Sequence, residues 1–382
     1  MIDASKYALV DLHLHVDGSL TPADVVEMAR MGGVELPTYE TEELRGLLEV
    51  PKHGLSLKDY LSRFRLPLSV MQKREAISYA VSRLICRLHA AGLIYAELRF
   101  APQQHVGGGL TQAEVVAAAV EGLREGLAAC NPGTGREGQP SHKCSSCTDE
   151  RGPSDSPSQC GIGAQLILCC MRGSGNEEAN RETARLAAQW IGQGVCAADL
   201  AGAEADFPTA GYRDLFAYVR SLGVPFTLHA GEAAGPESVM LALDYGASRI
   251  GHGIRCHDNP AVKARLRSLG VPLEICPTSN LDTRALPGVT GFAAYPLQDF
   301  IRDGVSVTIN TDNMSVSATT LSNEFAGLLG LPCGAGKRGH RAVISESEAA
   351  QCVRNAISAA FLPAAAKAAL LSLARQRMQI PL

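Results

Sequence analysis

The fold follows from one stretch near the start of the chain, Asp11-Leu12-His13-Leu14-His15-Val16-Asp17-Gly18-Ser19-Leu20. We expect this mostly apolar run to form a β-strand, on which side chains at positions i and i+2 point to the same side. His13 and His15 should therefore project together, close enough to bind one cation. The alternative is a pair of buried histidines with a packing role, so the rest of the chain must show whether further ligands exist.

The composition predicts a single folded domain over residues 1–382 and argues against several other classes. Hydrophobic residues make up 46% of the chain and charged residues 19%, which is enough to bury a large core. The formal net charge is −4 and no basic stripe occurs, so we expect no nucleic-acid partner. No run of 18 apolar residues occurs, so we expect no membrane span.

The start of the chain and its cysteines predict a cytoplasmic protein, which we expect to be a monomer. Residues 1–6 lack the apolar segment of a secretion signal. The 12 cysteines are scattered, and several lie in apolar runs such as Leu168-Cys169-Cys170-Met171. This usage indicates buried thiols in a reducing compartment rather than a disulfide framework.

Eight short apolar runs alternate with longer segments of helical periodicity. This alternation is typical of an α/β protein whose parallel sheet is buried on both faces. Eight such units predict a (β/α)8 TIM barrel, and a doubly wound open sheet is the alternative. The predicted strands are Tyr7–Val16, Leu93–Phe100, Ala164–Met171, Val195–Ala201, Pro225–His229, Arg249–His252, Pro272–Cys276 and Ser306–Thr311.

Two connections are unusual. Roughly 75 residues separate the first two predicted strands, far more than one βα connection needs. They contain an apolar helical stripe, which either packs on the barrel or forms a lid over its C-terminal face. The residues of this stripe are Leu57, Tyr60, Leu61 and Phe64.

The second unusual connection, 131–163, is rich in Gly, Pro and Ser, and Ile162 is its only large aliphatic residue. It cannot bury enough apolar surface to offset the entropy of ordering, so we predict a disordered or loosely held insertion. Because it enters near the N-terminal end of the third strand, it should lie on the bottom of the barrel. Four of its residues could bind a structural zinc, although the second half of a known spacing is missing. These residues are His142, Cys144, Cys147 and Cys160.

Ionisable side chains gather where the predicted strands end. His229, His252 and Asp312 each end one strand, and Glu232 follows His229 by three residues. Ionisable groups are costly to bury unpaired, and in a barrel these ends share the C-terminal face, where catalytic residues lie. One such histidine would more often be a packing residue, but the whole set indicates a functional site.

The set has a coherent chemistry. His13, His15, His229 and Asp312 offer three imidazoles and one carboxylate, which suits one zinc ion and leaves room for water. Zinc lowers the pKa of its water to about 7 and so provides hydroxide at neutral pH. His252 could then orient or deprotonate this water, and Glu232 could move a proton to or from the substrate.

Several motifs, in this order along the chain, resemble the signatures of adenosine deaminases. The similarity extends from about Asp11 to about Pro363 and omits the insertion. Because the motifs are several and ordered, they are more specific than any single one. They are Asp11–Leu20, Leu168–Arg172, Asp199–Gly202, His229–Glu232, Gly251–Gly253, Ile275–Asn280 and Asn310–Asn313.

The resemblance implies a zinc-dependent TIM barrel that hydrolyses the 6-amino group of adenosine or 2′-deoxyadenosine, a small-molecule reaction of purine salvage that gives inosine or deoxyinosine and ammonia. It assigns one Zn²⁺ to the four ligands named above. It also implies that Glu232 delivers a proton to purine N1 and that His252 lies beside the zinc-activated hydroxide that attacks C6. Asp312 would hold this water while it binds the metal.

The same resemblance implies the substrate contacts. Asp17 would bond the ribose 5′-hydroxyl, the backbone of Gly202 would meet purine N3, Asn313 would contact N7, and His15 would also face the substrate. The apolar stripe aligns with the family's gate, which favours the lid. Asn313 departs from an aspartate common in the family, although an amide can donate to N7 at any pH. Ala203 also replaces an aspartate, and we expect at most an indirect effect from it.

Three rival interpretations remain open. A deaminase of free adenine or another modified purine is the nearest one, but such relatives tend to carry Glu where this chain has Asp17. A binding protein that keeps only the fold should have lost a ligand or the proton donor, and none is missing. A two-metal amidohydrolase usually requires a bridging lysine after the fourth strand, where this chain has Asp199–Gly202.

Overall fold

The computed structural model describes residues 8–51, 57–131, 161–332 and 341–378. A parallel strand occurs at each of the eight predicted places, so the predicted α/β class is confirmed. The strands form two four-stranded sheets, in the orders β1-β2-β3-β4 and β5-β6-β7-β8. Their bounds are β1 Leu9–His15, β2 Leu93–Phe100, β3 Gly163–Met171, β4 Val195–Ala201, β5 His229–Ala230, β6 Ile250–His252, β7 Leu273–Ile275 and β8 Val307–Ile309.

The two sheets meet through backbone hydrogen bonds at both junctions. On one side, His15 N donates to Asp312 O and Asp312 N donates to His13 O, each over 2.7 Å. On the other side, Ala198 N donates to Pro225 O over 3.0 Å. The end of β8 therefore lies beside β1, and the residues before β5 lie beside β4.

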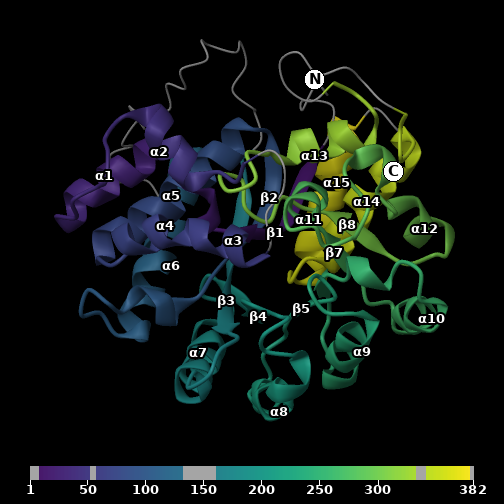
Figure 1. Ribbon diagram of the computed structural model, residues 1–382, viewed down its shortest axis with the longest axis horizontal. Coiled ribbons are helices and arrows are strands. Elements are labelled where there is room, and N and C mark those ends of the chain that lie inside the picture. The colour runs from purple at the N-terminus through teal and green to yellow at the C-terminus, as the bar shows by residue number, and fades with distance from the viewer. Residues whose placement is uncertain (1–7, 52–56, 132–160, 333–340, 379–382) are drawn as a thin grey trace.

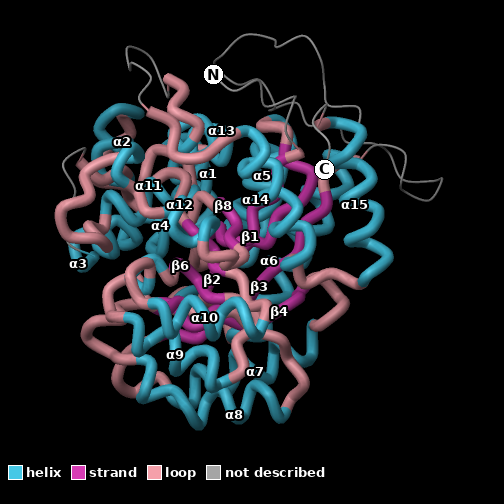
Figure 2. Tube along the Cα trace, turned by 90° about the vertical axis from the view of Figure 1, so that its right-hand side faces the viewer, coloured by secondary structure: helices cyan, strands magenta, loops and turns pink. Residues whose placement is uncertain are grey.

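Helices surround the strands in both views (Figures 1 and 2). Every residue of β1, β2 and β4 is buried, as expected for strands covered on both faces. The helices are α1 Pro22–Gly32, α2 Thr41–Leu48, α3 Leu57–Leu61, α4 Arg65–Val70, α5 Arg74–Ala90, α6 Gln112–Cys130, α7 Glu177–Trp190, α8 Arg213–Ser221, α9 Pro236–Tyr245, α10 Pro260–Leu269, α11 Pro277–Asp282, α12 Leu297–Arg302, α13 Leu321–Leu328, α14 Glu346–Ala359 and α15 Ala364–Arg377.

In the described part of the long connection between β1 and β2, the α-helices are α1 to α5. Its predicted apolar stripe spans α3 and the 3₁₀ helix Ser62–Phe64 that follows it. The side chain of Tyr60 is buried, and its hydroxyl lies 2.8 Å from Ser317 Oγ in the loop after β8. Leu61 and Phe64 are half-buried, and the side chain of Leu57 lies outside the described residues.

The predicted insertion ends slightly earlier than expected, because Gly163 pairs with Tyr95 as the first residue of β3. Asn131 Nδ2 donates to Ile162 O over 3.0 Å, so the two ends of the segment lie side by side. They lie where β3 begins, at the opposite end of the strand from Met171. The four possible zinc ligands of this segment lie outside the described residues.

The cysteines agree with the expectation of buried thiols. Eight of them belong to the described residues, and all eight are buried. Within the same residues, no helix combines the length and the apolar character that crossing a membrane requires.

Candidate metal centre and active site

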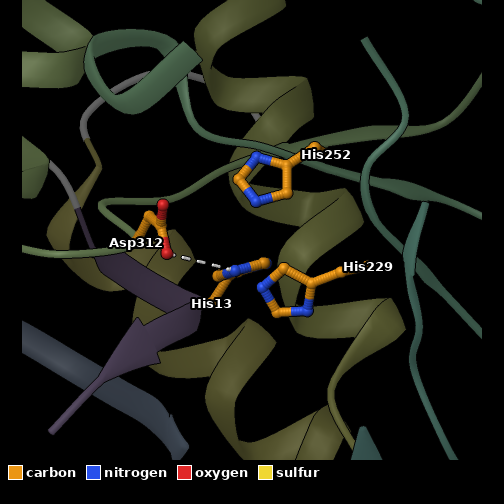
Figure 3. Close-up of side chains that lie close together, drawn as sticks. All are labelled: His13, His229, His252 and Asp312. Carbon is orange, nitrogen blue, oxygen red and sulfur yellow. Dashed lines mark ion pairs between the residues drawn. The ribbon is translucent and has the colours of Figure 1, made fainter. Parts of the chain in front are cut away.

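Four of the predicted site residues meet at the ends of β1, β5, β6 and β8. One ligand atom from each of His13, His229, His252 and Asp312 lies within 4.8 Å of the others. Figure 3 shows these four side chains close together. His15 joins them, because its Nε2 lies 3.3 Å from Nε2 of His229 and 3.4 Å from Oδ1 of Asp312. The structure therefore brings together all five metal-type side chains that the sequence singled out.

Two carboxylates orient the histidines. Glu274 Oε2 lies 2.8 Å from Nδ1 of His13, and Asp199 Oδ2 lies 2.9 Å from Nδ1 of His229. A carboxylate accepts a hydrogen bond from Nδ1–H, which leaves the lone pair of Nε2 free for a metal. Nε2 of His13 lies near Asp312 and Nε2 of His229 lies near His15, so both nitrogens face the common centre.

Asp312 is oriented in a similar way. Ser279 Oγ donates to its Oδ2 over 2.6 Å, and its other oxygen, Oδ1, faces the histidines. Asp312 and His252 both have left-handed backbones, with φ of 61° and 60°. Residues other than glycine rarely adopt this backbone conformation. Such backbone strain is concentrated at functional sites.

The distances between the donor atoms fit a tetrahedral zinc. Ligands at about 2.0–2.1 Å from zinc lie about 3.3–3.4 Å from one another in a tetrahedron. The distances of 3.3 Å from His15 to His229 and of 3.4 Å from Asp312 to His15 and to His13 match this edge length. In the described part of the chain, the buried Nε2 of His13 has no hydrogen-bond partner, which leaves it available as a ligand.

Sequence reasoning missed the ion network beneath these ligands. Arg99 donates to both orienting carboxylates, Asp199 and Glu274, over 2.9 Å, and is fully buried. Arg249 Nε donates to the other oxygen of Glu274 over 2.5 Å. The sequence did contain a sign of this network, namely charged residues inside apolar strands. Charged residues at such buried positions are normally paired with an opposite charge.

Glu232 lies in an environment that favours its protonated form. The residue is 7% exposed, and burial raises its pKa to about 8, with further contributions from the charges of Asp312 and Glu204. Its Oε2 lies 3.7 Å from Nε2 of His252. Glu232 is therefore a carboxylic acid at neutral pH, close to the histidine predicted to act with it.

Two neighbours define the state of His252. Asn280 Nδ2 donates to Nδ1 of His252 over 3.0 Å, and Tyr295 donates to the carbonyl oxygen of the same amide over 2.7 Å. Burial holds the pKa of His252 well below its usual value, and the charge of His13 lowers it further. His252 is therefore neutral, with its proton on Nε2.

The predicted substrate contacts lie around this centre. Asp17 lies two residues after β1 and is buried, and burial raises its pKa to about 7. Gly202 has a φ of 110°, which favours glycine, and a Cβ there would lie 3.3 Å from Cβ of Arg172. Asn313 packs against Gly18, where a Cβ would lie 1.8 Å from its Oδ1, an atom without a hydrogen-bond partner among the described residues.

A family model described as adenosine deaminase matches residues 8–136 and 147–376 of this chain. The break in the match lies inside the predicted insertion. The adenosine deaminase of Haemophilus ducreyi is 43% identical over 380 residues, which cover 99% of this chain and 98% of that protein. The adenosine deaminase of Enterococcus faecalis is 35% identical and covers 92% and 91%.

Solved structures with the same fold include other deaminases. The adenine deaminase of Arthrobacter aurescens has a TM-score of 0.77 at 25% identity, over 98% of this chain and 100% of that one. The N6-methyl-AMP deaminase of Arabidopsis thaliana has a TM-score of 0.75 at 22% identity, over 98% and 97%, and supports the fold alone.

Proposed function

Since this chain belongs to the adenosine deaminase family, we propose that it hydrolyses the 6-amino group of adenosine and 2′-deoxyadenosine, releasing ammonia and leaving inosine and deoxyinosine. One observation carries the proposal: four donor atoms, three of whose separations match the edge of a tetrahedral metal site, converge beside a buried carboxylic acid at the ends of parallel strands.

The residues that would hold one zinc ion are His13, His15, His229 and Asp312. Three distances between their donor atoms support this set. His252 belongs to the same cluster, but the donor from Asn280 occupies its Nδ1 and leaves a proton on Nε2, which excludes that nitrogen as a ligand in this state. When bound, zinc would lower the pKa of water to about 7 and so supply a nucleophile at neutral pH.

Glu232 would donate its proton to purine N1, and C6 would thereby become more electrophilic. Its raised pKa supports this role, because the acid form must be present at neutral pH. His252 would donate Nε2–H to the oxygen that attacks C6, which orients this oxygen rather than deprotonating it. The hydrogen bonds from Tyr295 to Asn280 and from Asn280 to His252 support this choice between the two roles left open by the sequence.

The remaining contacts would fix the substrate. Asp17 would bond the ribose 5′-hydroxyl, the backbone of Gly202 would approach N3, and the amide of Asn313 would donate to N7. His15 would face the reacting carbon from the metal side. The burial of Asp17 and Asn313 supports their contact with substrate in a site shielded from water.

We also propose that the two sheets form one closed barrel and that α3 and Ser62–Phe64 form a lid over its C-terminal face. The backbone bonds at both junctions support the closure. The bond from Tyr60 to Ser317, four residues after Asn313, supports the lid. A monomer in the cytoplasm, acting on a small molecule without nucleic acid or membrane, fits the net charge of −4 and the buried thiols.

Assaying adenosine, 2′-deoxyadenosine, adenine and AMP side by side, by the change in absorbance, tests this function. We expect turnover of the two nucleosides and little of adenine or AMP. Adenine as the best substrate would overturn the proposal in favour of the nearest rival. Metal analysis of the same preparation should give about one zinc per chain, and activity should disappear on chelation and return with zinc.

A further inference from the structure

The loop that carries Glu232 is held by a buried carboxylate that the mechanism above does not use. Glu204 lies in the loop after β4 and is 2% exposed. Its carboxylate accepts four consecutive backbone N–H groups, from residues 231, 232, 233 and 234, over 2.8 to 3.0 Å. It also accepts the hydroxyl of Ser238, in the first turn of α9, over 2.6 Å.

The carboxylate of Glu204 and its five hydrogen-bond donors provide partners for one another. Each of these polar groups would otherwise be costly to bury. Burial alone would raise the pKa of Glu204, but the bonds from Ser238 and Ala234 N–H and the charge of Arg172 lower it below its usual value. Glu204 is therefore ionised, and its charge complements the N-terminus of α9. The turn that it holds contains Gly231, whose φ of 74° favours glycine.

The metal ligand on the same loop is anchored by other groups. His229 is bonded to Asp199 through Nδ1, and its carbonyl accepts from Arg172 over 2.6 Å. Neither bond involves Glu204. Loss of the Glu204 carboxylate should therefore disturb Gly231–Ala234 while His229 stays in place.

We propose that Glu204 is a positioning residue for the reaction, which acts by holding the backbone of Glu232 so that its carboxyl group faces purine N1. The inference rests on the proposed role of Glu232. It links the loop after β4, where Gly202 would meet N3, to the loop after β5, which would donate to N1. The two contacts to the six-membered ring of the purine would then be fixed relative to each other by one side chain.

The test is a double-mutant cycle of Glu204→Gln and Glu232→Gln, with kcat, KM and zinc content measured for each protein. In Glu204→Gln, the new side-chain amide replaces one acceptor oxygen by a donor that faces backbone N–H groups. We expect this variant to lower kcat about 10²-fold, the size of effect that a misplaced catalytic group produces, with KM within a few-fold of the parent value. Zinc should remain at about one per chain.

In the Glu232→Gln background, adding Glu204→Gln should change kcat less than about threefold, because a residue that acts through another has no effect once that residue is removed. Additive losses, loss of zinc, or an unchanged kcat in folded Glu204→Gln would each overturn the inference. An active Glu232→Gln protein would instead contradict the proposed function itself. The two failures are therefore distinguishable.

The matched control is Asp24→Asn, a buried carboxylate that accepts the backbone N–H of Thr21 at the start of α1 and does not touch this loop. Asp24→Asn should keep kcat within about twofold of the parent value, because it lowers stability without displacing the residues of the active site. If Glu204→Gln does not fold, Glu204→Asp enters the same cycle, because it keeps the charge and shortens the reach. Its partial loss of kcat should likewise vanish in the Glu232→Gln background, and an additive loss would again refute the inference.

Discussion

Among single residues, Glu232 should determine how activity varies with pH. Its pKa is raised to about 8, first by burial and then by the charges of Asp312 and Glu204. The acid form is the proton donor, so activity should be present below this pKa and be lost as the pH rises through it. We expect kcat/KM for adenosine to fall about tenfold per pH unit above about pH 8. Initial rates measured from about pH 6 to 10 check this, and a profile that stays level to pH 10 would contradict it.

The amide of Asn313 should make the contact to N7 independent of pH. In the variant Asn313→Asp, a carboxylate can donate there only when it is protonated. We expect this variant to approach parent activity at acidic pH and to lose kcat/KM at a lower pH than the parent does. The measurement is the ratio of the two pH profiles with adenosine. A constant ratio across the range would show that Asn313 does not donate to the substrate.

The site residues differ in how far the sequence could predict them. His13 and His15 share one strand, and His229 and Asp312 were placed at the ends of two others, so strand periodicity together with the predicted barrel indicated that they would meet. Glu274 was not assigned a role, because it lies inside the predicted seventh strand, Pro272–Cys276, rather than at its end. A residue inside a buried strand gives no sign of which distant side chain it faces, so its contact with His13 could not be predicted.

At the level of elements, the predicted strands were correct in number and place, while several ends were wrong. Five of the eight predictions match or nearly match, but the predicted fifth strand, Pro225–His229, contains only the first residue of β5. Proline lacks a backbone N–H, and here only Phe226 forms an isolated bridge, with Ala198. An apolar run identifies a buried strand well. The residues at which the strand begins and ends depend on backbone hydrogen bonds to the neighbouring strands.

The proposed lid leads to a prediction about Tyr60. Its hydroxyl bonds Ser317 in the loop after β8, so Tyr60→Phe should weaken closure of α3 over the substrate while it keeps the apolar ring. A hydrogen bond contributes about 0.5–1.5 kcal/mol, so we expect KM for adenosine to rise about 2- to 10-fold with little change in kcat. Ser317→Ala should have a similar effect, and the double variant should be no worse than either one. Additive effects would exclude the bond as the cause.

At the level of the whole molecule, the candidate site and the two ends of the Gly-, Pro- and Ser-rich segment lie at opposite ends of the strands. The site residues lie where β1, β5, β6 and β8 end, whereas the insertion enters where β3 begins. The break in the family match, at residues 137–146, lies within that insertion. The framework around the site can therefore be kept while the connection before β3 changes in length and composition.

This separation predicts the result of a deletion. Asn131 and Ile162 are hydrogen-bonded, so replacing residues 132–160 by two glycines should join ends that already lie together. We expect the deletion to keep kcat/KM for adenosine within about threefold of the parent value, since long surface connections contribute little to stability.

Metal analysis gives a second, independent result. If the parent and the deleted protein both hold about one zinc per chain, the cysteines and histidine of the insertion bind none under these conditions. If the parent holds two and the deleted protein one, the insertion carries a structural site. A deleted protein that is folded and loaded with zinc but inactive would show that the insertion reaches the chemistry, against the placement of its two ends.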